Sequence, residues 1–356
     1  MQRLEIDRFY MERALQLARC GEGFTSPNPM VGAVIVADDR VIGEGYHRRF
    51  GGPHAEVWAV RSVSPADRAL LPLATIYVTL EPCSHYGKTP PCAAMLVEEG
   101  IGRVVIGCSD PNPKVSGRGV EMLRRAGIEV EIGVLEKECF ELNRRFMIAQ
   151  TLGRPYVMLK WAASADGYLD RRRDYREAPE KFSTELTIQQ MHRLRSQHDA
   201  LLVGSGTVIA DNPSLTVRYF AGMQPRPVVV DLRGRVGATA KVFTAPGCVL
   251  FTSSLRNDIP ATVCQIVVKA PVTMTALLEH LRQLGVSSVM VEGGAQLLTS
   301  FVEEGCWDDA RVEVAPRNLG TLGVCPMAVP CGVKTYEAAD AGNIIINVKN
   351  TIIAPK

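Results

Sequence analysis

The sequence has no apolar run that approaches the roughly 18 residues needed for a membrane span. Residues 1–7 are polar and lack the basic-then-apolar start of an export signal. Neither sign of charge is in excess, because 40 lysines and arginines stand against 38 aspartates and glutamates. Aromatic residues make up only 6% of the chain, so no basic surface interleaved with aromatics is expected. These absences argue against nucleic-acid and membrane partners, and we expect a cytoplasmic protein.

Disulfide-like spacing is also missing, although the chain has ten cysteines. In a reducing compartment, a group of Cys and His residues indicates a metal site rather than a disulfide framework. The length of 356 residues and the hydrophobic content of 46% suffice for two packed domains. The break Thr151-Leu152-Gly153-Arg154-Pro155 contains both Gly and Pro, so we expect domains at residues 1–150 and 155–356.

One histidine and two cysteines stand out in the first half of the chain. His54 lies in the motif Pro53-His54-Ala55-Glu56, and Cys83 and Cys92 lie about thirty residues further on. Three protein ligands with a fourth position open to water are typical of catalytic zinc, whereas structural zinc usually has four protein ligands. We therefore predict one Zn²⁺ per chain on His54, Cys83 and Cys92. A structural zinc knuckle, or reduced buried thiols, is the alternative.

Glu56 follows the histidine by two residues and is too close in sequence to be an easy fourth ligand. Zinc lowers the pKa of bound water to roughly 7, so Glu56 is placed to pass the water proton to a ring nitrogen and a departing amine. H-x-E followed by P-C and a second Cys is the signature of zinc-dependent nucleobase deaminases. That signature has two residues between its cysteines, whereas eight intervene here. The longer loop carries His85 and Lys88, which can touch a polar or anionic substrate.

Alternating strands and helices in the first half predict a three-layer α/β domain. The expected helices are residues 7–20, 54–63, 93–99, 119–126 and 136–149. The expected strands are residues 30–37, 41–43, 74–79, 103–107 and 128–134. Two polar loops flank these strands and are candidate ligand contacts: Asn28 precedes a buried strand, and Asp110 and Asn112 follow another. From the residues alone, Asn28 is more simply explained as a turn former between two prolines, and a long surface loop explains Asp110 and Asn112 as well as a ligand site does.

The second half also alternates strands and helices. The expected strands are residues 156–162, 200–203, 227–231, 247–251, 265–268, 288–292 and 311–315, and the expected helices are 183–195 with Ser183 as N-cap, 273–284 and 295–304. The basic stretch 170–181 is expected to be a solvated loop. Two glycine-rich turns, at Gly204-Ser205-Gly206 and at Glu292-Gly293-Gly294, suit a phosphate, but neither is a Rossmann fingerprint. The residues leave a nucleotide site and ordinary tight turns both open.

The first half closely resembles the deaminase domain of the bifunctional riboflavin biosynthesis deaminase–reductase. The resemblance is carried by the motifs at Ser26–Val34, Pro53–Val57, Glu81–Cys92 and Asp110–Pro113. It implies a cytidine-deaminase-like fold that removes the 2-amino group of a 2,5-diamino-6-ribosylamino-pyrimidinone 5′-phosphate. It also implies zinc on His54, Cys83 and Cys92 and a proton shuttle at Glu56. Substrate contacts are implied for Asn28, His85, Lys88, Asp110 and Asn112, with Lys88 suited to the phosphate.

The second half resembles the reductase domain of the same family, whose fold is similar to dihydrofolate reductase. The motifs are Lys160–Gly167, Thr207–Arg218 and Glu292-Gly293-Gly294. This resemblance implies NADPH-dependent reduction of the ribosyl group to a ribityl chain. For NADPH it implies Ala162, Thr207, Asp211, Gly294, Ala295, Gln296, Leu297, Leu298, Thr299 and Ser300. For the substrate it implies Arg195, Leu215, Arg218 and Glu292.

The leading interpretation is therefore a two-step enzyme that acts on a phosphorylated pyrimidine with zinc and NADPH, as a homo-oligomer, either dimer or tetramer. A deaminase of free nucleosides or RNA bases is a second hypothesis, which Lys88 and the second domain disfavour. A zinc-stabilised binding module without turnover is a third, which an intact Glu56 disfavours. The stretch after Val324 carries no motif of the family that we can use.

Overall fold

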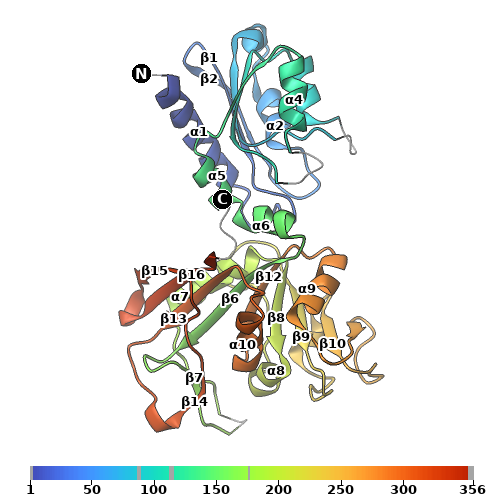
Figure 1. Cartoon of the computed structure of the whole chain (residues 1–356), viewed down its shortest axis with the longest axis vertical. Coiled ribbons are helices and arrows are strands. Elements are labelled where there is room, and N and C mark those ends of the chain that lie inside the picture. Colours follow the sequence, from blue (N-terminus) through green and yellow to red (C-terminus); the bar gives the residue numbers. More distant parts are fainter. Residues whose placement is uncertain (1–2, 86–89, 112–115, 175–176, 352–356) are drawn as a thin grey trace. The chain divides into compact units, whose positions relative to one another are not determined.

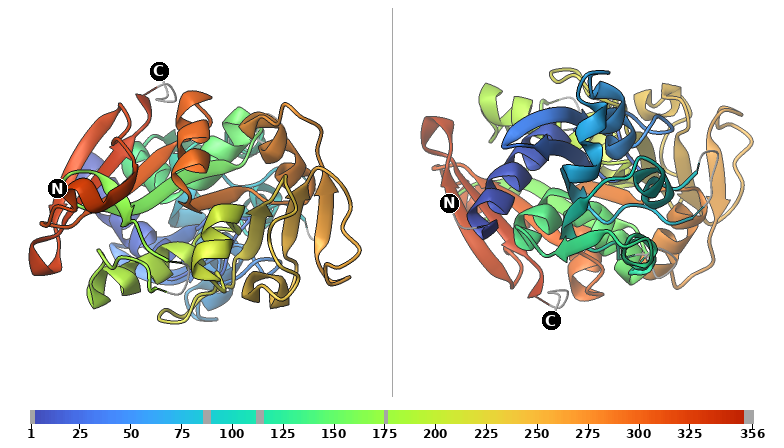
Figure 2. Two further views of the ribbon diagram at one scale, coloured as in Figure 1. Left: turned by 90° about the horizontal axis from the view of Figure 1, so that it is seen from below. Right: turned by 90° about the horizontal axis from the view of Figure 1, so that it is seen from above.

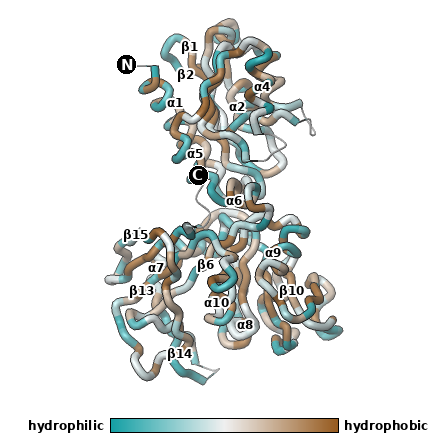
Figure 3. Tube along the Cα trace, in the orientation of Figure 1, coloured by the Kyte–Doolittle hydropathy of each residue, from teal (hydrophilic) through white to brown (hydrophobic). Residues whose placement is uncertain are grey.

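The computed structural model describes residues 3–85, 90–111, 116–174 and 177–351. The chain divides into two compact units, Met1–Gly153 and Arg154–Lys356, and Figure 1 labels the elements of both. Apolar residues run through the sheets of each unit (Figure 3). None of the helices among the described residues has the length and apolar character that crossing a membrane requires.

The first unit is built on a five-stranded sheet in the order β2-β1-β3-β4-β5. β1 runs antiparallel to β2 and β3, whereas β3, β4 and β5 are parallel. The strands are β1 Gly32–Ala37, β2 Arg40–Tyr46, β3 Thr75–Leu80, β4 Arg103–Cys108 and β5 Glu129–Ile132. The helices are α1 Arg3–Arg19, α2 Ala55–Ser62, α3 Cys92–Glu98, α4 Arg118–Arg125, α5 Glu136–Leu142 and α6 Arg144–Leu152, with a 3₁₀ turn at Arg68–Leu73.

Helices cover both faces of this sheet, so the three-layer arrangement is as expected. Apolar side chains of α2, α3 and α4 pack on one face, and those of α1, α5 and α6 pack on the other. All six residues of β1 are buried, which explains its continuous apolar sequence. The carboxyl ends of β3 and β4 lie side by side, and the loops that follow them therefore meet at one edge of the sheet.

The expected single helix over 136–149 is wrong, because Asn143 divides it into α5 and α6. Asn143 is buried, and its side chain accepts a hydrogen bond from the Met30 amide and donates one to the Met30 carbonyl, both at 2.8 Å. These two bonds hold the segment that leads into β1. The partner is 113 positions away, so no local pattern could reveal the break.

The second unit contains a nine-stranded sheet in the order β11-β10-β9-β8-β12-β6-β13-β16-β15. Its first seven strands are parallel, and β16 and β15 complete it antiparallel. The strands are β6 Tyr156–Ala163, β8 Ala200–Gly204, β9 Arg226–Val230, β10 Val249–Thr252, β11 Cys264–Val267, β12 Ser288–Gly293, β13 Asp309–Val314, β15 Val333–Ala338 and β16 Ile344–Lys349. β7 Tyr168–Arg171 and β14 Gly323–Pro326 form a separate two-stranded ribbon.

Helices flank both sides of the large sheet, as Figure 2 shows. The helices are α7 Glu185–Ser196, α8 Ser205–Asp211, α9 Met274–Gln283 and α10 Ala295–Glu303, with 3₁₀ turns at Lys241–Thr244, Gly320–Leu322 and Asp340–Gly342. Alternate residues of the parallel strands face α9 and α10 on one side and α7 and α8 on the other. The motif-free stretch after Val324 supplies β15 and β16, so it belongs to the sheet.

Two local expectations in this unit are wrong. The N-cap of α7 is Thr184, whose hydroxyl accepts the Thr187 amide in a reciprocal capping box, whereas Ser183 donates a hydrogen bond to the buried Glu313. Arg173 is not a solvated loop residue, because its side chain is only 7% exposed. Its guanidinium bonds to Asp170 at 2.7 Å and to Asp211 at 2.6 Å, which draws the charged loop towards α8.

Candidate functional site

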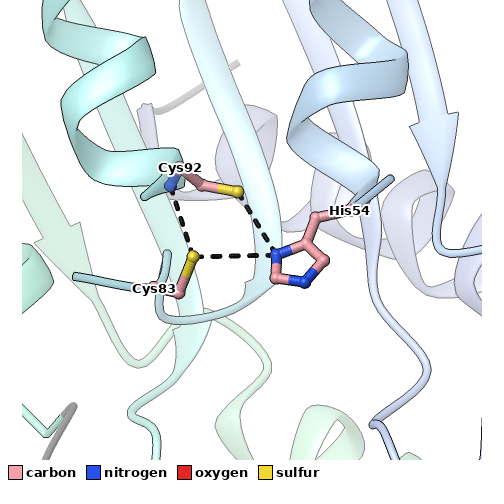
Figure 4. A group of neighbouring side chains, drawn as sticks. All are labelled: His54, Cys83 and Cys92. Carbon is pink, nitrogen blue, oxygen red and sulfur yellow. Dashed lines mark hydrogen bonds between the residues drawn. The ribbon is translucent and has the colours of Figure 1, made fainter. Parts of the chain in front are cut away.

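His54, Cys83 and Cys92 converge in the first unit from three different elements (Figure 4). His54 is the N-cap of α2, Cys83 follows β3, and Cys92 is the first residue of α3. The His54 Nδ1 atom lies 3.7 Å from the Cys83 Sγ atom and 3.4 Å from the Cys92 Sγ atom. All three ligand atoms lie within 4.8 Å of one another. One nitrogen and two sulfurs in this arrangement fit zinc, and the exposed His54 leaves the group open to solvent.

Contacts within the group favour the thiolate form of Cys83, whereas the Cys83 sulfur and burial raise the pKa of the Cys92 thiol. The Cys83 sulfur accepts the backbone amide of Cys92 at 3.3 Å. A hydrogen bond from the Cys92 thiol, together with His54, lowers the pKa of Cys83 to about 4. The Cys83 sulfur in turn raises the pKa of His54 to about 9. The Cys83 sulfur is therefore favoured as the thiolate, which is the form of cysteine that binds metal.

Glu56 lies in the first turn of α2 and is only 3% exposed. Burial raises the pKa of its carboxyl above the usual range, and the neighbouring His54 opposes that rise. The carboxyl is also within hydrogen-bonding reach of the Cys92 thiol. A carboxyl with a raised pKa beside a metal-ligating group can accept a proton and return it.

His47 is a residue of this site that sequence reasoning missed. Its Nδ1 lies 3.0 Å from the Pro53 carbonyl, which can only accept, so Nδ1 carries the hydrogen and the Nε2 lone pair accepts from the Asn28 amide at 3.3 Å. The His47 ring lies edge-on to His54 at 5.6 Å, and burial lowers the pKa of His47. Asn28 is thereby fixed beside the metal group with its carbonyl oxygen turned away from His47. A single histidine in a loop offered no sequence signal for this role.

Glu81 connects the cysteine loop with the polar loop after β4. It is 4% exposed, and its carboxylate accepts four backbone amides, from Asp110, Gly117, Gly119 and Val120, at 3.1–3.5 Å. Asp110 is consequently held next to the Cys83 segment, half-buried, while His85 is exposed. The predicted residues Lys88 and Asn112 lie outside the described residues. Glu81 is part of the motif Glu81–Cys92, but the sequence predicted no role for it.

Glu81→Ala is expected to loosen this loop, because four amide hydrogens, two of them buried, lose their acceptor. Each unpaired buried group costs about 1–3 kcal/mol, so the amides of Gly117 and Gly119 are expected to exchange with deuterium at least about tenfold faster. Hydrogen exchange followed by mass spectrometry measures this, and Glu121→Ala, at an exposed position of α4, is the matched control. Unchanged protection in Glu81→Ala would show that the carboxylate does not hold the loop.

The second unit has a cavity of about 810 Å³ at the carboxyl ends of β6, β8, β9 and β12. It has the size and position of a ligand crevice in an α/β sheet. The predicted residues that line it are Ala162, Thr207, Asp211, Glu292, Gly294, Ala295, Gln296, Leu297 and Ser300. Leu298 instead lies in the apolar core, and the Thr299 hydroxyl contacts the Met327 sulfur at 3.6 Å.

The turn at Gly293-Gly294 approaches Thr207 so closely that it requires glycine. A side chain at Gly293 would place its Cβ 2.9 Å from the Thr207 hydroxyl, and Gly294 has a φ of 81°. The backbone amides at the start of α10 therefore stay accessible from the cavity. From the sequence alone, a phosphate site could not be distinguished here from an ordinary tight turn.

A buried ion pair backs the cavity, and of its two members Glu292 lines the cavity whereas Arg195 does not. Arg195, 9% exposed, binds Glu292 through two parallel bonds of 2.6 and 2.5 Å, and it also donates to the Thr216 carbonyl. Burial opposes the charged form of Glu292, but Arg195 outweighs it and lowers the pKa of that carboxyl. Lys160 lies nearby, and burial lowers its pKa. This pair can hold a polar substrate group against the cavity floor.

Leu215 and Arg218 do not line the cavity. Leu215 is buried, and the Arg218 amide donates to the His192 ring at 3.1 Å, which places both on the segment that backs Arg195. Four basic residues that sequence reasoning did not assign line it instead, namely Lys160, Arg173, Arg233 and Arg235. The last two follow β9 in the run Asp231-Leu232-Arg233-Gly234-Arg235, whose arginine pair was the available signal.

Comparison with known proteins matches both units. Residues 4–108 match the family model for the cytidine and deoxycytidylate deaminase zinc-binding region. Residues 155–336 match the model for the RibD C-terminal domain. The chain is 41% identical over 355 residues to riboflavin biosynthesis protein RibD of Aquifex aeolicus, covering 96% of this chain and 98% of that protein. It is 37% identical to the same-named protein of Escherichia coli, covering 90% and 91%.

Solved structures agree over nearly the whole chain. One is a diaminohydroxyphosphoribosylaminopyrimidine deaminase/5-amino-6-(5-phosphoribosylamino)uracil reductase from Thermotoga maritima, with a TM-score of 0.87 and 37% identity. It covers 97% of this chain and 99% of that one. Another is Acinetobacter baumannii RibD, with a TM-score of 0.86, 36% identity and the same coverage.

Proposed function

The chain belongs to the RibD family of bifunctional riboflavin biosynthesis enzymes, and from this premise we propose the two reactions of its deaminase and reductase units. The first unit removes the 2-amino group of 2,5-diamino-6-ribosylamino-4(3H)-pyrimidinone 5′-phosphate by hydrolysis. The second reduces the ribosyl group of the product to a ribityl chain with NADPH. The convergence of His54, Cys83 and Cys92 beside the buried Glu56 is the observation that carries the proposal.

In the proposed deamination, the metal ligands and the Glu56 carboxyl have separate roles. His54, Cys83 and Cys92 would hold zinc, which supplies a water that ionises near neutral pH. Glu56 would accept one proton of the water and pass it to the ring nitrogen, and would then pass the second proton, from the added hydroxyl, to the amine, which leaves as ammonia. Its burial supports this role, because a carboxylate whose pKa is raised is a stronger base than an ordinary glutamate and takes the water proton more readily.

Substrate contacts in this unit are proposed for Asn28, His85 and Asp110. The hydrogen bond from the Asn28 amide nitrogen to His47 leaves the Asn28 oxygen to accept from an exocyclic amine of the ring. Asp110, held by the Glu81 network, lies on the loop expected to reach the same ring. Lys88, proposed for the phosphate, and Asn112 complete the set and lie outside the described residues.

The reduction is proposed to take place in the second-unit cavity. NADPH would lie along Ala162, Thr207, Asp211 and the segment from Gly294 to Ser300, and hydride would pass to the first carbon of the ribosyl group. The protein mainly positions the nicotinamide against the sugar in such a reaction. Glu292 and Arg195 support the proposal, since their paired charges stand beside the glycine turn and can orient sugar hydroxyls. Leu215 and Arg218 would act from the neighbouring segment.

We also propose a homo-oligomer, dimer or tetramer, and a cytoplasmic location. β15 ends the large sheet with all six residues exposed, among them Val333 and Tyr336, and such an edge invites pairing with a second copy. Light scattering of the purified protein tests the first point. A reducing compartment suits the site because its two thiols must stay reduced to bind zinc.

The decisive test is to incubate the purified protein with the diamino-pyrimidinone phosphate, with and without NADPH. Ammonia should appear in both cases, and the nicotinamide absorbance should fall only when NADPH is present. Free cytidine and a short RNA should give no ammonia. Ammonia release from those compounds, or none from the pyrimidinone phosphate, would refute the assigned substrate.

Replacing both thiols in Cys83→Ser, Cys92→Ser is expected to remove the metal. Zinc content should fall from about one per chain to near zero, because serine oxygen does not replace thiolate in such a site. Ammonia release should disappear, while reduction of the already deaminated substrate should persist. Elemental analysis and the two assays measure this, and Cys20→Ser, at an exposed cysteine of the same unit, is the control. Undiminished zinc in the double variant would contradict the ligand assignment.

A further inference from the structure

Residues 214–218 lie in the connection between α8 and β9, outside every helix and strand. Leu215, within this segment, is 3% exposed and has a φ of 51°. Few residues other than glycine adopt such a backbone conformation unless their surroundings hold them in it. The conformation of this segment is therefore set by contacts with the rest of the second unit.

Side chains from two directions bind the backbone of this segment. The Arg195 guanidinium donates to the Thr216 carbonyl at 3.0 Å. The Gln224 side chain accepts the Val217 amide at 2.8 Å and donates to the Val217 carbonyl at 2.9 Å. Three consecutive polar groups of the backbone are thus satisfied by side chains, in the way that a neighbouring strand would satisfy them.

His192 holds the next group along the chain. It lies on α7 and is fully buried, and its Nδ1 atom accepts the Arg218 amide at 3.1 Å. Burial, Arg195 and Arg218 lower the pKa of His192 to about 4, so the ring is neutral at neutral pH and carries its hydrogen on Nε2. The neutral ring with a lone pair on Nδ1 is the form that this hydrogen bond requires.

Arg195 links the same backbone to the cavity. It follows His192 by three positions on α7, so both side chains reach the segment from one face of that helix. The Arg195 guanidinium binds both the Thr216 carbonyl and the Glu292 carboxylate, which lines the cavity. The backbone of residues 216–218 is therefore tied to the cavity through a single side chain.

Arg218 is the side chain that this segment presents to solvent. Its guanidinium lies 5.6 Å from the centroid of the Tyr219 ring, and that ring meets the His192 ring edge-on at 4.8 Å. Among the described residues, no carboxylate pairs with Arg218. An exposed cation on a fixed backbone, without a counter-ion of its own, suits an anionic group of a ligand.

We infer that His192 and Gln224 are positioning residues of the reductase, which fix the backbone of residues 216–218 and so hold Arg218 in place for the pyrimidine substrate. This inference rests on the proposed function, in which Arg218 contacts that substrate. His192 is fully buried and Gln224 uses its amide for Val217, so both act through the segment and not on the substrate. Their contribution is to reduce the conformational freedom that the segment would otherwise lose on binding.

Oxidation of NADPH with the deaminated substrate, measured in the full-length protein, tests the inference. His192→Leu and Gln224→Met keep a similar side-chain volume but remove the hydrogen bonds, and each is expected to raise KM for the substrate about 5- to 30-fold. The kcat and the KM for NADPH should change less than about twofold, because loss of a contact remote from the transferred hydride weakens substrate binding alone.

Two further variants accompany these measurements. His192→Asn should bring KM back to within about threefold of the unaltered protein, because the asparagine oxygen can accept the same amide. Gln283→Met, at an exposed position of α9, is the matched control for Gln224→Met and should leave KM unchanged.

A double-mutant cycle with Arg218→Ala separates positioning from support of the fold. Arg218→Ala alone should raise KM for the substrate. Adding His192→Leu or Gln224→Met to it should raise KM by less than about twofold more, because the side chain that they position is already gone. Calorimetric binding of NADP⁺ to every variant shows that the second unit has folded, and Gln224→Met, at the surface, decides the test if buried His192→Leu has not.

Other outcomes overturn the inference in distinct ways. Increases in KM that multiply in the cycle would show that His192 and Gln224 act independently of Arg218. Unchanged KM in both single variants, or an equal loss of NADP⁺ binding in both, would remove the positioning role. Normal KM in Arg218→Ala would remove Arg218 from the substrate site, and the inference with it. Failure of the unaltered protein to oxidise NADPH with the deaminated substrate would instead refute the proposed function, and no variant is needed to observe it.

Discussion

Ammonia release from the pyrimidinone phosphate is expected to fall by about 10²- to 10⁴-fold in Glu56→Gln, the usual contribution of a positioned general acid–base group. Glutamine keeps the volume of the buried side chain but can neither accept the water proton nor return it. The three ligand atoms come from other residues, so zinc content should stay unchanged. A rate assay for ammonia, together with elemental analysis of the same sample, measures both quantities.

Two controls separate a chemical role for Glu56 from a structural one. Glu98→Gln, at an exposed position of α3 in the same unit, should retain the full rate. Reduction of the deaminated substrate by Glu56→Gln should also proceed normally, because that reaction belongs to the second unit. Retention of more than half of the deaminase rate in Glu56→Gln, or equal loss of both activities, would contradict the assigned role.

Glu292→Gln is expected to have the largest effect on the second unit, because it breaks a buried ion pair and leaves Arg195 charged without a counter-ion. Removing one partner of such a pair costs about 3–5 kcal/mol. The unfolding transition of the second unit should therefore move to lower temperature, and NADPH oxidation should fall by at least about 10²-fold. Calorimetry and the nicotinamide absorbance measure the two effects. Glu279→Gln, in an exposed ion pair of α9, is the matched control and should change neither.

A double variant distinguishes stability from function at this site. Arg195→Met, Glu292→Met removes both charges, and replacement of a buried pair by apolar side chains of similar size is often neutral or stabilising. The unfolding temperature should therefore recover while NADPH oxidation stays low. Recovery of oxidation together with stability would show that the pair only supports the fold. Normal stability and oxidation in Glu292→Gln alone would show that the pair is dispensable.

Sequence reasoning was strongest where chemistry and spacing coincide within a short segment. The fold classes expected for the two halves, cytidine-deaminase-like and dihydrofolate-reductase-like, are confirmed by the family matches and by the similar structures. The metal group was found because His54 and Glu56 lie two residues apart and two cysteines recur at a loop end, and the structure brings its three ligand atoms together. The glycine turn at Gly293 could be found but not interpreted, because tight turns and phosphate sites use the same residues.

Prediction from the sequence was weakest where a residue acts through a partner that is distant in the sequence. Asn143 breaks an otherwise helical pattern because its side chain satisfies Met30, and nothing within the helix indicates that bond. Arg173 has the composition of a solvated loop, yet Asp211 draws it into the cavity wall. His47 and Glu81 act by holding Asn28 and the loop of Asp110, which are contacts across the fold.

The sequence by itself determined which chemistry the chain carries, because zinc ligation and proton transfer require particular side chains at close spacing. It also determined the alternation of elements, because the period of apolar residues follows the local backbone. Only the tertiary structure decided how those groups are oriented and which charges remain unpaired. The role of a side chain such as Arg195 depends on Glu292, and these two residues lie on a helix and a strand that meet only when the sheet has assembled.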